Sequence, residues 1–118
     1  MPTDPNALIA RHMAKDTKWL CFAYTWCNRH TCWPDRCPPQ CEDRTPREFA
    51  DPANTLRLAG WWGWRLTHAP WTDRDADVAG EIDDAMGLVA AGFIVAAEGA
   101  RRVRDIIAAR LKELDDAD

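Results

Sequence analysis

This sequence lacks any apolar run long enough to cross a membrane. Its longest apolar stretch, AMGLVAAGFIVAA at 85–97, covers thirteen residues, whereas a membrane-spanning helix needs about twenty. The first residues, MPTDPNALIARHMAKD, also lack the charged, apolar and small-residue pattern of a secretory signal peptide. These absences predict a cytoplasmic protein without a membrane span, and the apolar run is expected to form part of a buried helix.

The sequence is also poor in groups that catalyse reactions. It has three histidines, no Ser/His arrangement and no phosphate-binding loop, and its main cluster of carboxylates is the acidic stretch at 73–84. Such a stretch is typical of a solvated helix N-terminus, because negative charge there complements the helix dipole. We therefore expect no enzymatic activity.

A basic surface for nucleic acids is lacking as well. The net charge is −4; residues 1–50 hold seven Lys or Arg against six Asp or Glu, and residues 51–118 hold eight against thirteen. Nucleic acid is therefore an alternative partner that the charge balance does not favour. The candidates for phosphate contacts are the four basic residues nearest the cysteines, which are few for such a surface: Arg29, Arg36, Arg44 and Arg47.

What the sequence does have is a dense cysteine cluster. All five cysteines lie within LCFAYTWCNRHTCWPDRCPPQC at 20–41, together with His30. Thiols stay reduced in the cytoplasm and five cannot all pair, so a metal site is favoured over a set of disulfides. Two further residues are reserve ligands. His30 is the first reserve and would replace Cys32. Cys21 is the second, because it is expected in the tail of the first helix as a small buried residue. The four expected ligands share one turn-rich loop: Cys27, Cys32, Cys37 and Cys41.

Zinc is the expected metal, held in a closed structural site on four thiolates. Such a site would close the proline-rich loop and stabilise a small protein. The alternative cofactor is an iron–sulfur cluster, which also takes four cysteine ligands and would make the protein a redox or oxygen sensor. The gaps between successive cysteines are five, four, four and three residues, so none has the two-residue gap of common zinc ribbons.

The predicted fold class is mainly α. An N-terminal helix is expected with Asp4 as its N-cap and Pro5 as its first residue, continuing through NALIARHMAKDTKWLCFA at 6–23. The cysteine- and proline-rich loop at 27–52 follows, with a short helix beginning in TPRE at 45–48 and room for a two-stranded ribbon around the metal.

A tryptophan-rich segment comes next, and Asn54 is expected to cap its helix. Its tryptophans are expected in the core or at a partner contact rather than stacked on bases, because a small domain with few Phe or Tyr needs them for packing. Four of them fall within eleven residues: Trp61, Trp62, Trp64 and Trp71.

From Thr72 onward the sequence predicts one long helix. A break at Gly92 is the alternative, but no polar turn residues surround this glycine, which favours the continuous helix. Its start is acidic and its end basic, so two antiparallel copies would pair opposite charges; packing on the first helix is the alternative. Apolar residues recur at gaps of four and three, as in a heptad seam: Ile82, Met86, Val89, Phe93, Ala96, Ala100, Val103 and Ile107.

We expect two domains, a metal-binding head at 1–71 and a helix for packing or oligomerisation at 72–118. This organisation favours an interaction or assembly subunit that binds copies of itself or joins a larger protein complex. The alternative function is a small regulator that binds DNA or a transcription protein through the cysteine loop, with zinc as scaffold or an iron–sulfur cluster as sensor.

Overall fold

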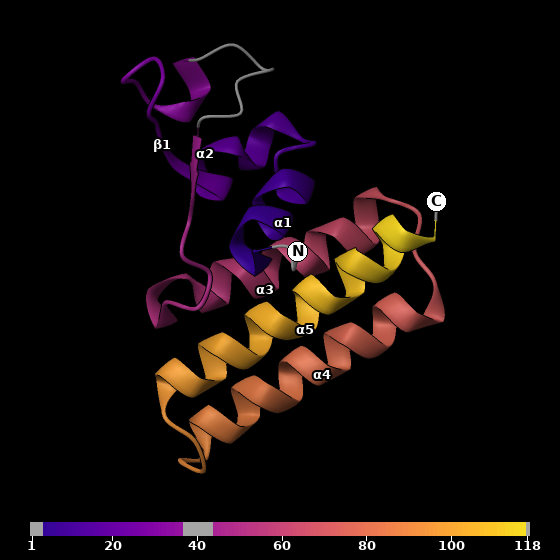
Figure 1. Cartoon of the computed structure of the whole chain (residues 1–118). Coiled ribbons are helices and arrows are strands. Elements are labelled where there is room, and N and C mark those ends of the chain that lie inside the picture. Colours follow the sequence, from indigo (N-terminus) through magenta and orange to yellow (C-terminus); the bar gives the residue numbers. More distant parts are fainter. Residues whose placement is uncertain (1–3, 37–43, 118) are drawn as a thin grey trace. The chain divides into compact units, whose positions relative to one another are not determined.

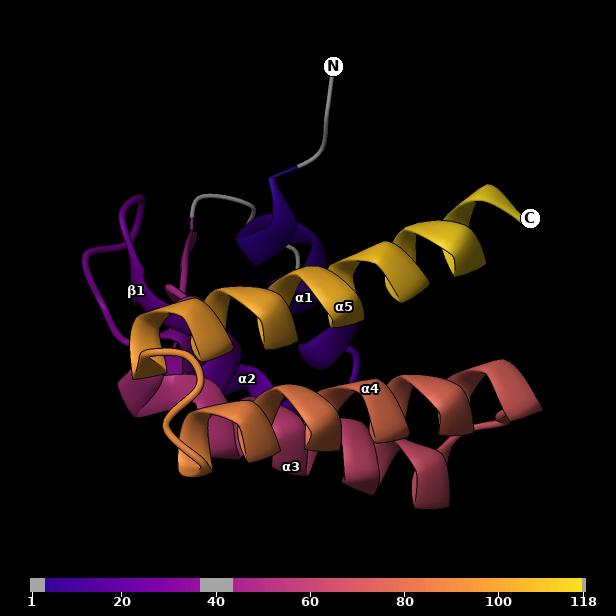
Figure 2. The same ribbon diagram turned by 90° about the horizontal axis from the view of Figure 1, so that it is seen from below.

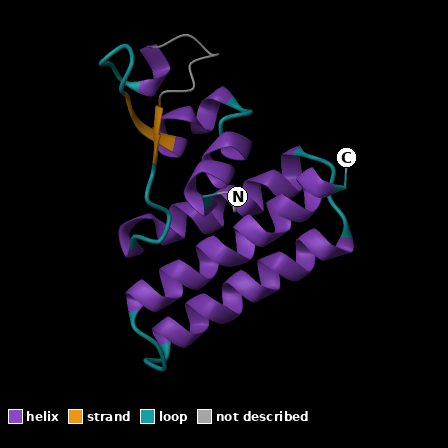
Figure 3. Ribbon diagram, viewed as in Figure 1, coloured by secondary structure: helices purple, strands orange, loops and turns teal. Residues whose placement is uncertain are grey.

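A computed structural model describes residues 4–36 and 44–117 of the chain. The protein is mainly helical, as its sequence predicts, with one small two-stranded sheet (Figure 1, Figure 3). It divides into two compact units, of which unit 1 is Met1–Arg47 and unit 2 is Glu48–Asp118. None of the helices in the described ranges combines the length and the apolar character that crossing a bilayer requires.

Unit 1 begins with helix α1 (Pro5–Met13), and the sequence predicts this start correctly. The Asp4 side chain accepts a hydrogen bond from the backbone N–H of Asn6 at 3.0 Å, and proline occupies the first turn. Proline is tolerated there because its missing N–H would have no partner within the helix. The helix buries four of its apolar side chains: Leu8, Ile9, Ala10 and Met13.

The expected continuation of α1 to residue 23 is wrong. Asp16 has an extended backbone, and its side chain accepts a hydrogen bond from the N–H of Lys18 at 2.9 Å. It therefore caps a new element, the 3-10 helix η1 (Thr17–Trp19), which leads into the single turn of α2 (Leu20–Ala23). An aspartate that caps the next turn competes with continuation of the previous helix.

Two short strands complete unit 1, and the two-stranded ribbon is confirmed. Strand β1 (Tyr24–Cys27) pairs antiparallel with β2 (Arg44–Pro46), and the 3-10 helix η2 (Pro34–Arg36) lies between them in the sequence. The short helix expected at 45–48 is wrong, because Thr45 lies opposite Trp26 in the ribbon. Pairing with a distant strand here overrides a local helix signal.

Unit 2 opens with helix α3 (Pro52–His68). Asp51 caps it by accepting the N–H of Ala53 at 2.9 Å, so the expected cap at Asn54 is wrong by three residues. The side chain of Asn54 instead donates to the backbone carbonyl of Glu48 at 3.0 Å.

The tryptophans of this segment divide between core and surface. Trp61 and Trp62 are buried, and the Trp62 indole N–H donates to the carbonyl of Asp75 at 3.1 Å. Trp64 stacks on His68 with their ring centroids 4.3 Å apart. Trp71 is 53% exposed. The expectation of core packing is thus confirmed for Trp61 and Trp62.

The last two helices, α4 (Asp73–Ala90) and α5 (Ala96–Asp116), form an antiparallel hairpin and run side by side (Figure 1, Figure 2). The single continuous helix that the sequence favours is therefore wrong, and the alternative break at Gly92 is confirmed. The apolar run at 85–97 is divided between the last turns of α4, the hairpin turn and the first two residues of α5, rather than forming part of one buried helix.

A Schellman motif ends α4. The N–H of Phe93 donates to the carbonyl of Leu88 at 2.9 Å, and the N–H of Gly92 donates to the carbonyl of Val89 at 3.0 Å. Gly92 has a φ angle of +81°, a left-handed conformation that glycine adopts without a steric penalty. The motif satisfies carbonyls at the helix end without the help of polar side chains.

Each of the three helices in unit 2 packs against the other two. The hairpin helices come very close at Gly99, where a Cβ atom would collide with Cγ2 of Val89. The core that they enclose with α3 consists of large apolar side chains: Leu58, Trp61 and Trp62 from α3, Val78 and Ile82 from α4, and Val103, Ile107 and Leu111 from α5.

One buried carboxylate, Asp75, connects all three helices. It caps α4 by accepting the N–H of Thr72 at 2.8 Å, and it pairs with Arg110 on α5 at 2.8 Å and Arg65 on α3 at 3.5 Å. Burial alone would raise the pKa of Asp75, but the hydrogen bonds from Arg110 and Thr72 and the charges of both arginines outweigh it and lower that pKa. The acidic start of α4 and the basic half of α5 thus meet within one chain.

Candidate functional site

The candidate metal ligands Cys27 and Cys32 stand at the two ends of one tight turn in unit 1. The N–H of Cys27 donates to the carbonyl of Cys32 at 2.9 Å, and the two residues form an isolated antiparallel bridge. Thr31 closes the turn with a φ angle of +47°, which is uncommon for a residue other than glycine. Strand pairing fixes one end of the turn, since Cys27 is the last residue of β1 and lies opposite Arg44.

His30 lies at the same thiol. Its backbone N–H donates to Cys27 Sγ at 3.4 Å, and its ring nitrogen Nδ1 lies 3.3 Å from this sulfur. Metals bind the thiolate form of cysteine. Sulfur and nitrogen ligands of one tetrahedral zinc ion are about 3.5 Å apart, given the usual bond lengths. The separation between Cys27 and His30 is close to that value.

The expected ligand set is not assembled by the described residues alone. Within 4–36 and 44–117, no three Cys, His, Asp or Glu side chains lie close enough together to hold a metal ion. Cys37 and Cys41 lie outside the described residues. Cys27 is fully buried, whereas Cys21 is exposed on α2, so the expectation that Cys21 is a buried apolar residue is wrong.

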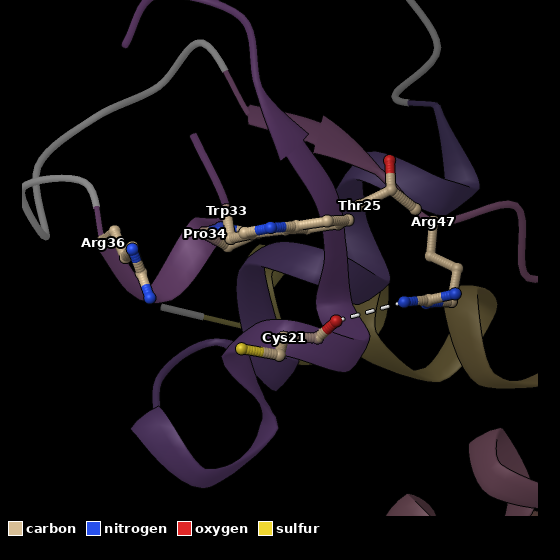
Figure 4. Close-up of a pocket in the computed structure, with 6 residues that line it drawn as sticks. All are labelled: Cys21, Thr25, Trp33, Pro34, Arg36 and Arg47. Carbon is tan, nitrogen blue, oxygen red and sulfur yellow. Dashed lines mark hydrogen bonds between the residues drawn. The ribbon is translucent and has the colours of Figure 1, made fainter. Parts of the chain in front are cut away.

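A pocket of about 400 Å³ lies in unit 1 beside Cys21 (Figure 4). Trp33 is 59% exposed and contributes its indole to the pocket; its ring meets that of Trp26 edge-on, with centroids 5.2 Å apart. The guanidinium of Arg47 donates to the Cys21 carbonyl at 3.1 Å, the dashed line in Figure 4. The lining residues are Cys21, Thr25, Trp33, Pro34, Arg36 and Arg47.

Two of the four arginines near the cysteines hold unit 1 together. Arg47 donates to the carbonyls of Cys21 and Phe22 and covers the Phe22 ring. Arg44 is 9% exposed and lies over the ring of Tyr24. Burial raises the pKa of this tyrosine, although the positive charges of Arg44 and Arg11 oppose the shift.

A second candidate site lies in unit 2 at the end of the α4–α5 hairpin. We call it the apolar end and define it by Leu56, Met86, Val89, Phe93 and Val95. Phe93 is 78% exposed, Leu56 is 72% exposed and Val95 is 71% exposed. No charged residue occurs in the sequence from 85 to 97, so the hairpin turn presents an uncharged surface.

A groove of about 310 Å³ opens within the apolar end. Leu56 on α3 forms one wall, and Met86 and Val89 on α4 form another. Gly99 lines the groove at the point where α5 approaches Val89 of α4 closely. The groove is completed by small residues and by the first turns of two helices: Pro52, Thr55, Ala96, Gly99 and Ala100.

Sequence reasoning missed the apolar end, although part of its signal was present. The uncharged run at 85–97 suggested burial, and the seam pattern placed Phe93 inside a helix interface, whereas the ring lies exposed on the hairpin turn. Leu56 had no signal of its own, because only the packing of three helices decides which face of α3 stays open. The chain matches no protein-family model, no curated protein and no solved structure.

Proposed function

We propose that this chain is an assembly subunit that binds another protein chain through the apolar end of unit 2. The observation that carries the proposal is the exposure of Leu56, which lines an apolar groove, together with the exposure of Phe93 and Val95 in the hairpin turn just before groove residue Ala96. Single exposed apolar side chains are common on soluble proteins, whereas a contiguous apolar patch with a groove is typical of a binding surface. Exposed aromatic side chains beside a pocket are also typical of the residues that dominate binding energy.

In this proposal unit 1 is stabilised by a structural zinc ion on Cys27, Cys32, Cys37 and Cys41. The turn that joins Cys27 to Cys32 supports the first two ligands, and the N–H that His30 directs at Cys27 Sγ fixes the position of this sulfur. His30 stays the reserve ligand, supported by its short distance from this sulfur. An iron–sulfur cluster is the alternative cofactor. Either site needs reduced thiols, which suits the cytoplasm.

The alternative function, a regulator that binds DNA through the cysteine loop, receives less support. Arg44 and Arg47 are engaged with rings and carbonyls of unit 1, while Arg29 and Arg36 are the exposed members of the four. Two exposed arginines are few for a surface that tracks phosphates, since each phosphate contact adds to both affinity and salt dependence.

The test of the assembly function is photo-crosslinking from the apolar end in cells. A photoreactive benzoyl-phenylalanine at position 93 is expected to give discrete protein adducts, because Phe93 would lie at the contact. The same residue at position 71 is the matched control, since Trp71 is also aromatic and exposed but lies in the α3–α4 connection. Equal adduct yields from both positions, or adducts from neither, would contradict the proposal.

A further inference from the structure

Two free thiols of unit 1 belong to residues that the backbone holds directly opposite each other. Cys27 and Cys32 form an antiparallel bridge, and the N–H of Cys27 donates to the carbonyl of Cys32 at 2.9 Å. Residues in a hydrogen-bonded antiparallel pair have Cα atoms about 5.5 Å apart, and their side chains leave the pair on the same face. Disulfides most often join Cα atoms about 5.5–6 Å apart. The backbone of the turn therefore has the spacing that a disulfide between these two residues requires.

The turn between the two cysteines is held in place at both ends. Strand pairing fixes Cys27, which lies opposite Arg44. Two residues after Cys32, the buried Pro34 begins η2. The N–H of His30 donates to Cys27 Sγ at 3.4 Å, so this sulfur lies against the turn that leads to Cys32. Formation of the disulfide thus needs rotation of side chains and little movement of the backbone.

The two thiols differ in their access to solvent. Cys27 is fully buried, whereas Cys32 is partly exposed. A dissolved oxidant can therefore reach Cys32 but not Cys27. Cysteines that respond to oxidants are typically accessible and are often placed beside a second cysteine, which converts the first oxidation product to a disulfide. Cys32 suits the first of these roles and Cys27 suits the second.

We propose that Cys27 and Cys32 are a reversible redox pair that hydrogen peroxide oxidises to a disulfide. The Cys32 thiolate attacks one peroxide oxygen and the O–O bond breaks, which leaves a sulfenic acid on Cys32 and releases hydroxide. The Cys27 thiol then attacks the Cys32 sulfur; the S–S bond forms, and the hydroxyl group leaves with the thiol proton as water. Both sulfurs are oxidised and the peroxide is reduced. Exchange with two molecules of a small thiol restores both cysteines and yields the disulfide of that thiol.

This inference goes beyond the function proposed above, because the pairing needs only the two cysteines and no metal. Its consequence for zinc does rest on the proposed metal site. Zinc binds thiolates, and a sulfur within a disulfide is no longer a thiolate. Oxidation would therefore remove Cys27 and Cys32 from the four expected ligands and release the ion.

The test is oxidation of the purified full-length chain by hydrogen peroxide, followed by blocking of the remaining thiols and mass spectrometry of tryptic peptides. Trypsin cleaves the chain between Cys27 and Cys32 and again between Cys32 and Cys37, so each disulfide joins a different pair of peptides. The Cys21→Ser variant leaves Cys27 as the only cysteine of its peptide. In this variant the disulfide of Cys27 with Cys32 is expected as the main product.

Cys37 provides a matched control within the same chain. Four residues separate Cys32 from Cys27, and four also separate it from Cys37. The cost of closing a loop in an unfolded chain depends on the length of the loop, so concentrated urea should give both disulfides in comparable amounts. The ratio of the disulfide with Cys27 to the disulfide with Cys37 is expected to be at least about tenfold higher in the folded chain, because the bridge holds Cys27 opposite Cys32.

A ratio that is the same in both states, or a sulfenic acid that persists on Cys32 without a disulfide, would overturn this inference. A zinc-binding dye added during the oxidation separates the redox pair from the metal site. Release of zinc without the disulfide of Cys27 with Cys32 would support the metal site and overturn the redox pair. The disulfide in a protein that holds no zinc would support the redox pair and contradict the metal site. Zinc that stays bound to the oxidised chain would exclude these two cysteines as its ligands.

Discussion

Asp75 shows how a single buried charge determines the arrangement of unit 2. Its side chain is 2% exposed, and a buried carboxylate is costly unless charges and hydrogen bonds compensate it. Here Arg110 and Arg65 supply opposite charges from two other helices, and the N–H of Thr72 supplies a hydrogen bond. The position along α5 at which Arg110 reaches Asp75 therefore sets the register of the hairpin, because any shift would leave a buried charge without its partner.

Asp75→Asn is expected to destabilise unit 2 by about 3 kcal/mol, because it leaves the buried guanidinium of Arg110 with only the half-exposed carboxylate of Glu113 as its anion. Urea unfolding followed by circular dichroism measures the change. Asp77→Asn is the matched control on the same helix; Asp77 is exposed, so its replacement is expected to change stability by less than about 0.5 kcal/mol. Equal stabilities of the two variants would contradict the role assigned to Asp75.

The stability contributed by Asp75 also depends on pH in a defined direction. Its pKa in the folded state lies below its ordinary value, so the unfolded state binds the proton more tightly. The stabilisation is therefore fully present above the ordinary value of about 3.9 and is lost as the pH falls through the lowered folded value. The difference between the wild type and Asp75→Asn is expected to be constant near neutral pH and to shrink below about pH 4.

At the scale of elements, the boundaries with local signals could be predicted from the sequence and those with distant causes could not. Asp4 followed by Pro5 marks the start of α1 through contacts within a few residues. Strand β2 depends instead on pairing with β1, about twenty residues away, which a local helix signal at 45–48 cannot reveal. The break at Gly92 could be predicted only as an alternative, because its Schellman motif uses backbone groups and no polar side chains.

The same distinction applies to the candidate sites. The cysteine spacing indicated the turn region of unit 1, and Cys27 and Cys32 do lie at the ends of one turn. The closeness of the His30 ring to Cys27 depends on the turn conformation, including the unusual φ angle of Thr31, which the sequence does not specify. Leu56 joins the apolar end only through the packing of α3 on the hairpin, so no local pattern identifies it.

The start of α5 provides a prediction in which stability and binding change in opposite directions. Val95 is the N-cap residue, and its side chain cannot accept a hydrogen bond. Val95→Ser would complete a capping box with Glu98 and is expected to stabilise the chain by about 1 kcal/mol. It also removes an apolar side chain from the apolar end, so the yield of crosslinked adducts from position 93 is expected to fall.

Val95→Ala separates the two effects. It removes the same apolar surface without supplying a cap, so it is expected to lower the adduct yield from position 93 like Val95→Ser but without raising the free energy of unfolding. A serine variant that is more stable and gives the wild-type yield of adducts from position 93 would exclude Val95 from the contact. Retention of a poor N-cap at the apolar end is consistent with a functional role for this exposed surface.

At the scale of the whole molecule, the two units differ in how they can be stabilised. Unit 2 has three packed helices and a continuous apolar core. Unit 1 is Met1–Arg47, and domains of this size rarely gain enough stability from an apolar core alone. All five cysteines of the chain fall within unit 1. The cysteines therefore lie in the unit that would gain the most stability from the proposed metal.

Removal of the metal is therefore expected to affect the two units unequally. Elemental analysis of the protein purified without oxygen is expected to find one zinc ion per chain, and an absorption spectrum is expected to show no visible colour. Chelation should then broaden or shift the amide resonances of unit 1 in nuclear magnetic resonance spectra, while those of α3, α4 and α5 persist.

Cys27→Ser is expected to prevent metal binding, whereas Cys21→Ser, which changes an exposed thiol on α2, is expected to retain it. If the analysis finds iron with sulfide and the protein is brown, the cofactor is an iron–sulfur cluster rather than zinc. A protein without any metal would contradict the proposed site.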